Sequence, residues 1–448
     1  MSIIKTGKSK GYGSSPNKIT RNVIALGMVS LFTDAASEMI YPLVPIFVTL
    51  LGSSALILGV IEGVAETTAA MLKLISGIIS DKLGKRKILV VLGYGISTFS
   101  RPFTGIVSAA WQIIFVRTVD RIGKGIRTAP RDALIASSVN DRIRGKAYGF
   151  HRALDHAGAV IGPFLALSAL IILILFFNMQ DTGLILRWTF VLAIIPGICA
   201  VVVLLIFVQE KAASISSAQK IRFSLKQFDK NFIIYLGIVV LFTLGNSSDA
   251  FLLFRVQDAL HHSQSLNSLI YSIPLIGDMV SKFGDVETQK KLIDILFIPM
   301  IWAFFHIIKV IFSTPLGALS DKIGRKIVIS IGWGIYAFVY FAFALLDRLS
   351  DVMQIIATFI LFAIYAFYYA FSEGTEKAFV ADLVKPELRG SAFGLFNFAI
   401  GLSALPASII FGILYKEFGA GVAFGTGALI AFVSLLLFSG MVKEKSNH

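Results

Sequence analysis

Apolar stretches long enough to cross a bilayer alternate with short polar segments along most of the chain. A helix needs roughly 20 apolar residues to cross a hydrocarbon core of about 30 Å, and about twelve stretches here are that long. They lie near residues 22–50, 55–80, 88–108, 110–137, 146–177, 186–208, 232–256, 292–319, 327–346, 352–381, 390–415 and 420–442. This pattern predicts an all-α integral membrane protein with twelve transmembrane helices.

A short polar loop occurs twice and indicates two homologous halves. In each copy an Asp closes one apolar stretch, a Gly permits a turn, and basic residues precede the next stretch. We expect the two loops to form a gate that pins helix ends together; the alternative is that their basic residues only fix topology. The predicted gate residues are Gly77, Asp81, Gly84, Lys85, Arg86, Gly317, Asp321, Gly324 and Arg325.

The duplication predicts two pseudo-symmetric six-helix bundles, and parallel repeats of this kind place substrate at their interface near the bilayer midplane. The expected parts are a tail at 1–21, a bundle at 22–208, a central loop at 209–231, a bundle at 232–442 and a tail at 443–448. Residues 257–291, with His261 and His262, form a polar insertion in the second bundle. That insertion is either decorative or captures substrate or a partner.

Composition excludes a soluble globular protein. Hydrophobic residues make up 56% of the chain and charged residues 15%, with a mean hydropathy of +0.79, whereas soluble domains carry roughly 25% charged residues. The net charge of +14 does not indicate nucleic-acid binding, because Lys and Arg gather in alternate polar segments and the loops at 51–54 and 105–109 carry none. This asymmetry predicts an inner-membrane protein with both termini in the cytoplasm.

Motifs for catalysis and energy conversion are absent from the sequence. It contains no GxxxxGK[ST] phosphate-binding loop, no nucleophile–base pair and no set of metal ligands. The single cysteine, Cys199, lies in an apolar stretch and cannot form an intrachain disulfide. We therefore expect no enzyme activity, no cofactor and no metal.

The fourth apolar stretch carries a charged stripe that its counterpart in the second half lacks. Each charge at a helix centre costs roughly 2.5–3.5 kcal/mol on insertion, so such residues are functional candidates. In the tenth stretch, Tyr365 and Tyr369 align with Asp120 and Lys124. One basic wall and one aromatic wall suit an anionic organic molecule such as a carboxylate or a carboxylate-type siderophore. The predicted substrate contacts are Arg101, Arg117, Lys124, Lys309, Tyr365 and Tyr369.

Taken together, the paired GxxSDKxGxK loops, the six-plus-six layout and the basic central loop resemble the major facilitator superfamily of secondary transporters. The stretches 33–45 and 131–136 are similar to a prokaryotic permease subgroup of that superfamily. The resemblance implies alternating access, transport of a small-molecule substrate coupled to protons by symport or antiport, and function as a monomer.

Within the fourth stretch, Arg121 and Gly125 resemble a motif whose arginine that superfamily uses in proton coupling. We expect Asp34 or Glu38 to carry the proton with Arg121 as a switchable partner; the alternative is a static ion-pair network. The full set of proton-coupling candidates is Asp34, Glu38, Glu62, Glu66, Asp120, Arg121, His151, Arg152 and Asp155. Gly158 to Pro163 resembles a motif of proton-linked drug exporters, so efflux of drugs or metabolites is the alternative function, and a sensor without net flux a remote one.

Overall fold

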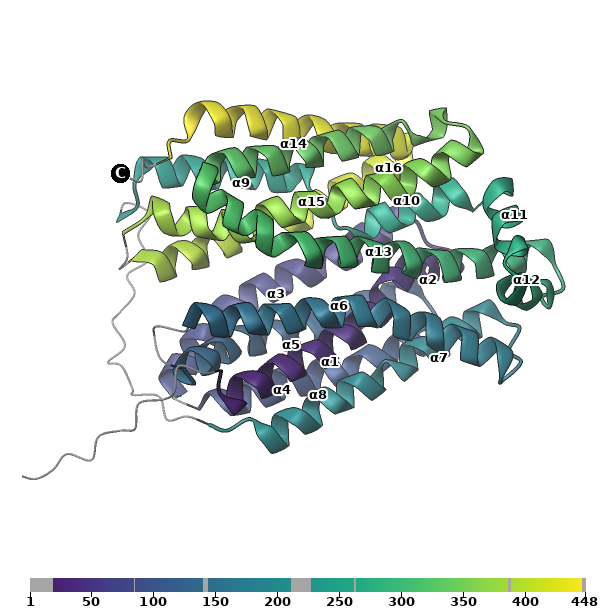
Figure 1. Ribbon diagram of the computed structural model, residues 1–448, viewed down its shortest axis with the longest axis horizontal. Helices are drawn as coiled ribbons and strands as arrows, with labels where there is room; N and C mark the ends of the chain where they lie inside the picture. Colours follow the sequence, from purple (N-terminus) through teal and green to yellow (C-terminus); the bar gives the residue numbers. More distant parts are fainter. Residues whose placement is uncertain are drawn as a thin grey trace, which may run out of the picture.

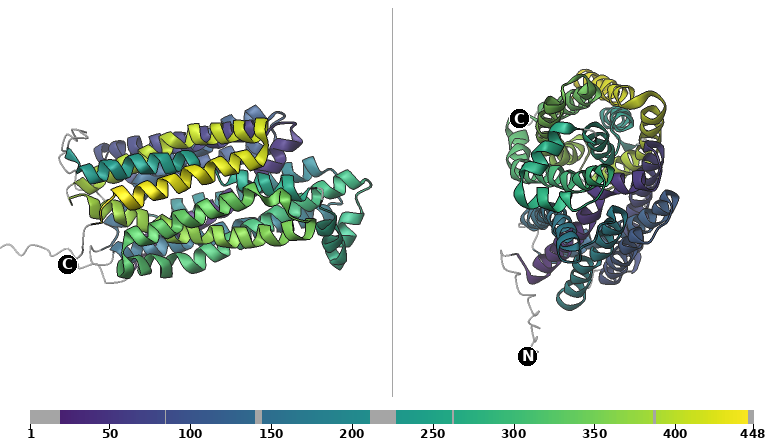
Figure 2. Two further views of the ribbon diagram at one scale, coloured as in Figure 1. Left: turned by 90° about the horizontal axis from the view of Figure 1, so that it is seen from above. Right: turned by 90° about the vertical axis from the view of Figure 1, so that its right-hand side faces the viewer.

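The computed structural model describes residues 19–83, 85–139, 144–210, 227–261, 263–385 and 388–444. Within these ranges the regular secondary structure is helical, and most helices run side by side along the long axis of the molecule (Figure 1). The right-hand view of Figure 2 looks down these helices end-on. The predicted all-α class is confirmed.

Among the described residues, the first half of the chain contributes ten helical elements. They are α1 (Arg21–Ile40), η1 (Tyr41–Leu43), α2 (Val44–Leu50), α3 (Ala55–Leu83), α4 (Arg86–Ser100), η2 (Arg101–Gly105), α5 (Ala110–Ser137), α6 (Arg144–Leu175), α7 (Thr182–Leu192) and α8 (Ile194–Phe207). Pro42 and Pro45 interrupt the first crossing between α1 and α2, because proline lacks an N–H and cannot continue an α-helix without a break.

The second half contributes nine elements in the described chain. They are α9 (Lys230–Gly245), α10 (Ala250–Leu260), α11 (Gln264–Ser272), α12 (Pro274–Ser281), α13 (Val286–Ile323), α14 (Arg325–Ala344), η5 (Leu346–Arg348), α15 (Asp351–Leu383) and α16 (Arg389–Met441). Helix α13 begins at Val286, inside the range 257–291 expected for the polar insertion. The short helices α11 and α12 project at the end of the molecule away from the start of α1 (Figure 1).

Twelve membrane crossings follow from these described helices. Nine stretches are long and apolar enough to span a bilayer. One of them, within α16, holds two crossings, because Gly419 breaks the helix with φ 84° and ψ 172°. The charged 28-residue α5 and the 15-residue α4 continued by η2 supply the remaining two.

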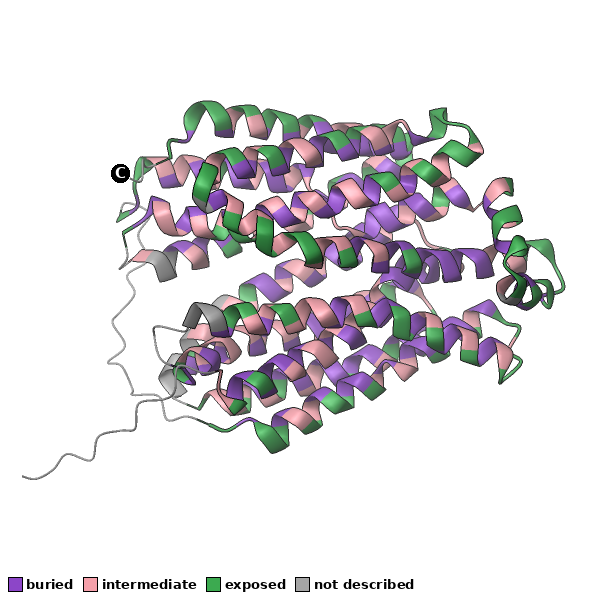
Figure 3. Ribbon diagram, in the orientation of Figure 1, coloured by how far each residue is buried: buried purple, intermediate pink, exposed green. Residues whose placement is uncertain are grey.

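Exposed apolar side chains cover the outside of the helix bundle. Buried residues lie mainly between helices and exposed ones along their outer faces (Figure 3). On α5, Trp111 and Phe115 are 65% and 69% exposed, on the opposite side from the buried Arg117 and Arg121. Lipid tails can cover such a surface, since the backbone polar groups are already paired inside the helices.

Glycines bring the helices of this bundle into backbone contact at several crossings, among them α3 with α16 and α1 with α6. A Cβ at Gly59 would overlap the carbonyl oxygen of Ser408, where α3 meets α16. A Cβ at Gly158 would overlap the carbonyl oxygen of Leu31, where α1 meets α6. Small residues permit this close packing in membranes, and the α3–α16 crossing joins the first half to the second.

Hydrogen bonds between the halves lie near the loop at 51–54 and in the middle of the molecule. Gln257 Nε2 donates to Thr49 Oγ1 at 3.0 Å, and Tyr41 lies 3.3 Å from Ser248 between their hydroxyl oxygens. Thr67 Oγ1 donates to the carbonyl oxygen of Gly401 at 2.6 Å. The bonds between described residues of the two halves thus favour the end of the bundle that is far from the start of α1.

Candidate functional site

Broken helices face each other across the two halves. The first crossing is interrupted at 41–43 and the seventh at 246–249, and interruptions at matching positions of a repeat are a pointer to a transport site. Ser248 Oγ donates to Glu62 Oε2 at 3.2 Å and also contacts Tyr41. The unwound segment therefore brings a polar residue of the second half onto a carboxylate of the first.

A ladder of ion pairs links α3 to α5. Arg117 Nη2 lies 2.8 Å from Glu62 Oε1, and Arg121 Nε lies 3.2 Å from Glu66 Oε1. Residues four apart share one helix face, so the spacing on each helix matches that on the other. The Glu62 and Arg117 side chains are 2% and 5% exposed, whereas Glu66 is 39% exposed. The Arg117–Glu62 pair is therefore shielded from solvent, whereas the Arg121–Glu66 pair is partly accessible to it.

Arg121 has Glu66 as its partner in this conformation. The sequence hypothesis paired it with Asp34 or Glu38; instead its nearest carboxylates are Glu66 and, at 3.9 Å, Asp120. The reason is geometric, because α5 packs along α3 over their whole shared length, whereas it touches α1 at only a few points.

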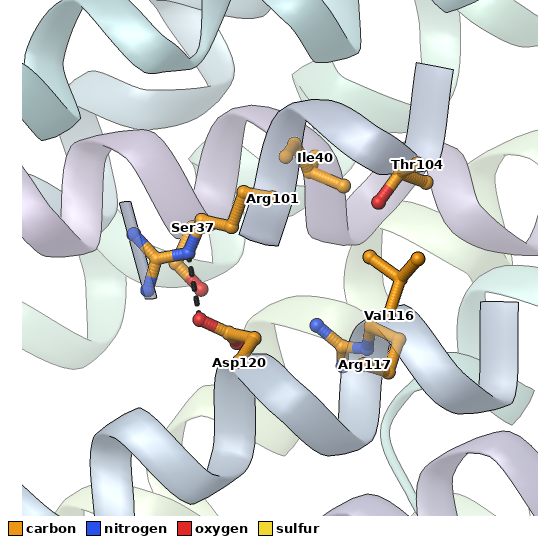
Figure 4. A pocket seen from close by; sticks show the side chains of 7 residues that line it. All are labelled: Ser37, Ile40, Arg101, Thr104, Val116, Arg117 and Asp120. Carbon is orange, nitrogen blue, oxygen red and sulfur yellow. Dashed lines mark hydrogen bonds and ion pairs between the residues drawn. The ribbon is translucent and has the colours of Figure 1, made fainter. Parts of the chain in front are cut away.

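Asp120 is held mainly by Arg101, which closes a small pocket between α1, η2 and α5 (Figure 4). Arg101 Nε donates to Asp120 Oδ1 at 3.0 Å, and its Nη1 donates to the carbonyl oxygen of Thr33 at 2.9 Å. The pocket has room for about 10 Å³, which is near the space one water needs. It is too small for a substrate, so Arg101 here orients Asp120 and α1.

In the second half, tyrosines converge on a carboxylate at the start of α10. Tyr365 Oη donates to Asp249 Oδ1 at 2.6 Å, and Tyr369 Oη donates to Asp249 Oδ2 at 2.8 Å. Lys309 Nζ lies 4.2 Å from the centre of the Tyr369 ring, a cation–π contact. The predicted aromatic wall therefore contains a negative charge, Asp249, that was not among the predicted site residues.

A chain of alternating charges crosses between the halves through α6, α15 and α13. Arg152 Nη1 lies 3.5 Å from Asp155 Oδ2, and Arg152 also forms an ion pair with Glu373. The other Glu373 oxygen lies 3.2 Å from Lys309 Nζ. One arginine of the first half thus contacts carboxylates of both halves.

Asp34 of α1 and Asp155 of α6 lie within electrostatic range of each other. Ser30 Oγ, also on α1, donates to Asp155 Oδ1 at 2.5 Å. The close α1–α6 crossing thus brings two carboxyl groups of the first half together.

Glu38 and His151, two further proton-coupling candidates, differ in their hydrogen bonding. Trp302 Nε1 donates to Glu38 Oε2 at 2.7 Å, and His306 Nε2 lies 3.8 Å from the same oxygen. Glu38 of α1 is therefore bonded to α13 of the second half. His151 is buried on α6, and its Nε2 has no hydrogen-bond partner in the described part of the chain.

The gate loops are attached within their own halves. Arg86 Nη1 donates to the carbonyl oxygen of Ala133 at 3.3 Å, and Arg325 Nε lies 2.5 Å from Asp382 Oδ2. Gly324 has φ 98°, a left-handed conformation that favours glycine. Gly77 and Gly317 lie inside α3 and α13, and Lys85 is exposed. Gly84 and the side chains of Asp81 and Asp321 lie outside the described residues, as does His262.

Each half also has a set of hydrogen bonds, here called a clasp, in which an Asn and a Glu bind backbone groups at the ends of helices. Sequence patterns did not predict these bonds. In the first, Asn22 Oδ1 accepts from the Gln209 backbone N–H at 2.8 Å, and Glu210 accepts from the backbone N–H groups of Arg86 and Lys87 at 3.2 and 2.7 Å.

In the second clasp, Asn231 Oδ1 accepts from the Lys443 backbone N–H at 2.9 Å. Glu444 accepts from the backbone N–H groups of Arg325 and Lys326 at 2.7 and 3.3 Å. In both clasps a carboxylate caps the helix that follows the gate loop, where the helix dipole favours negative charge.

Comparisons with known proteins agree with this geometry. The family model of the Major Facilitator Superfamily matches residues 26–284 and 287–447. An uncharacterized MFS-type transporter of Methanocaldococcus jannaschii is 34% identical over 423 residues, which cover 94% of this chain and 95% of that protein. The multidrug resistance protein MdtH of Enterobacter sp. is 29% identical over 128 residues, 28% of this chain and 32% of that protein. The crystal structure of a D-xylose-proton symporter has the same fold, with a TM-score of 0.69 at 15% identity over 95% of this chain and 98% of that one.

Proposed function

The chain belongs to the Major Facilitator Superfamily and is a multi-pass membrane transporter, and from that premise we propose that it moves a small organic anion by alternating access coupled to protons. It acts as a monomer in the inner membrane with both termini in the cytoplasm. A carboxylate or a carboxylate-type siderophore is the proposed kind of substrate.

The charge chain between the halves carries this proposal. Arg152 contacts Asp155 and Glu373, and Glu373 also contacts Lys309. When one half moves relative to the other, the Arg152–Glu373 contact is lost and each charge needs a new partner. A proton on a carboxylate or an anion beside a cation supplies that partner, so movement, protonation and anion binding are linked.

Asp34 and Asp155 are the proposed proton carriers. They lie within electrostatic range of each other, and Asp155 also contacts Arg152, which bridges the halves. When Arg152 leaves Glu373 and binds Asp155 more closely, it favours the charged carboxylate, and a proton carried by this pair of carboxyl groups is released. Proton release is then tied to separation of the halves.

The cavity walls support an anionic substrate. The first half presents Arg121 and Lys124 beside the partly exposed Glu66, and the second presents Tyr369 with Lys309 above its ring. Cationic groups can bind a carboxylate while the aromatic ring packs against an apolar portion of the same molecule.

The test is transport of a panel of organic anions into proteoliposomes with and without an imposed pH gradient. Asp34→Asn and Asp155→Asn should abolish accumulation driven by the pH gradient yet retain exchange of labelled for unlabelled substrate. Full gradient-driven accumulation in both variants would reject these carriers. Failure of the wild-type protein to move any anion of the panel would reject the anionic substrate.

Efflux of drugs or metabolites is the second candidate. The partial similarity to multidrug resistance protein MdtH and the glycines at 158 and 162 before Pro163 support it. Overexpression that confers resistance to several lipophilic cations would favour efflux, and unchanged sensitivity would count against it. Net accumulation of any solute in proteoliposomes eliminates a sensor without flux.

A further inference from the structure

Three lysines lie beside the charge networks without sharing in their ion pairs. They are Lys73 on α3, Lys124 on α5 and Lys377 on α15. Arg117, Arg121, Arg152 and Lys309 each have a carboxylate partner. In the described part of the chain, none of the three lysines has a carboxylate oxygen within 4.0 Å. Three cationic groups therefore lie outside the direct ion pairs of these networks.

Two of these lysines are held together by the crossing of α3 and α5. Ser76 Oγ donates to the carbonyl oxygen of Gly125 at 2.8 Å, and a Cβ at Gly125 would lie 2.5 Å from Leu72 Cβ. Lys73 and Lys124 each adjoin a residue of this contact in sequence. The backbone thus fixes two ammonium groups of the first half beside each other.

Lys377 contributes the third charge from the second half. It lies one turn beyond Glu373, the residue that binds Arg152, and its side chain is exposed. A Cβ at Gly374 would meet no atom within 4 Å, so this face of α15 borders open space. Lys73 lies within electrostatic range of Lys124 and Lys377, as well as of Glu66 and Arg121. The three lysines are therefore neighbours across the two halves, next to the open space at Gly374.

That space faces the interior of the molecule. On α3, Ile75 is 49% exposed among the outer apolar side chains, and at 100° per residue it lies on the opposite side of the helix from Glu66 and Lys73. Lys73 therefore faces away from the lipid side. Lysines in membrane-spanning helices commonly face a water-filled cavity, and the partly exposed Glu66 lies on the same face.

We propose that Lys73, Lys124 and Lys377 form a binding site for organic anions with two or more negative charges, such as di- or tricarboxylates. The site rests on the proposed function and names its substrate class more narrowly. Three separate ammonium groups match several carboxylates better than one, because each acts as a point charge with rotatable donors. An anion bound there contacts α3 and α5 of one half and α15 of the other, so it draws the halves together on the side where α1 begins.

The experiment uses the purified full-length protein in lipid nanodiscs at constant ionic strength, with citrate as the polyvalent probe and butyrate as the monovalent one. Citrate should raise the unfolding temperature and bind measurably by calorimetry. Lys73→Gln and Lys377→Gln should each weaken citrate binding about tenfold, the effect of losing one charged hydrogen bond. Lys73→Arg should retain binding, since it keeps the charge.

Lys230→Gln is the matched control, because Lys230 is an exposed lysine at the start of α9, on the same side of the molecule. Equal weakening by Lys230→Gln, or butyrate binding as tight as that of citrate, would overturn the site. Lysine-dependent citrate binding without flux of any anion would support the site and reject the proposed transport. Flux of anions that is unaffected in Lys73→Gln and Lys377→Gln would support transport and reject the site.

Discussion

Helices α5 and α15 occupy matching places in the two halves, yet their inward faces differ in chemistry. Helix α5 carries Arg117 and Arg121, which pair with carboxylates on α3. Helix α15 carries Tyr365 and Tyr369, which donate to Asp249. The two clasps, in contrast, repeat the same bonds with the same residue types, Asn and Glu. The two halves therefore share the hydrogen bonds of the clasps at the ends of their helices. They differ in the residues on the inward faces of α5 and α15.

The largest effect is expected where α5 differs most from α15. Arg117→Ala leaves Glu62 buried without its cation, and breaking a buried pair on one side costs about 3–5 kcal/mol. Thermal unfolding of the purified protein in detergent should show the loss. The double variant Arg117→Leu with Glu62→Leu should recover most of the stability, because no unpaired charge remains. A single variant as stable as the wild type would mean that the ladder does not stabilise the first half.

A smaller effect is expected at the clasps. Asn22→Ala and Asn231→Ala each remove two hydrogen bonds to a backbone segment, and Asn22→Ala also removes the bond from Asn22 Nδ2 to Ser138 Oγ. At about 1 kcal/mol per bond, Asn231→Ala should lose about 2 kcal/mol and Asn22→Ala about 3 kcal/mol. Unfolding in detergent measures both, with Asn397→Ala as the control because that exposed side chain bonds only within its own helix. Equal losses would show that the bond to Ser138 adds nothing to the first clasp.

The smallest effect is expected at a contact that only the second half has. His261 Nδ1 lies 2.6 Å from Asp294 Oδ2, and its Nε2 lies 3.5 Å from Glu287 Oε1, which also contacts Lys291. The hydrogen bond to Asp294 raises the pKa of His261 above its usual value.

The folded state therefore binds this proton more tightly than the unfolded state. The stabilisation is full below the unfolded pKa of about 6.5 and is lost as the pH rises through the raised folded pKa. Unfolding temperatures measured across that range should fall with pH in the wild type and fall less in His261→Gln. Identical pH profiles would exclude the contact as a source of pH dependence.

Hydropathy alone was enough to predict the fold, because a span of about 20 apolar residues has few solutions other than a helix. The charged stripe of α5 and the i, i+4 spacing of Glu62 and Glu66 could also be recognised from the sequence. The partner of Arg121 could not be predicted, because helical spacing defines a face and does not say which helix lies opposite that face.

The contacts of Asp249 and Glu373 could not be predicted from the sequence for a related reason. Asp249 accepts hydrogen bonds from Tyr365 and Tyr369, which lie more than a hundred positions away in the chain. Glu373 forms an ion pair with Arg152, which belongs to the other half. Both residues were visible as charges within apolar stretches. Only the packing of α10, α15 and α6 shows which of the many charged residues meet.

Close contacts at Gly59 and Gly63, together with the Thr67–Gly401 hydrogen bond, attach the first part of α3 to α16 of the second half. At 1.5 Å per residue, the stretch from Thr67 to Leu83 measures about 24 Å. A rotation of about 10° at Thr67 would therefore displace Leu83 by about 4 Å, while the attached part of the helix stays in place. A side chain added at Gly59 would disturb that attachment and so change the position of the whole far end of α3.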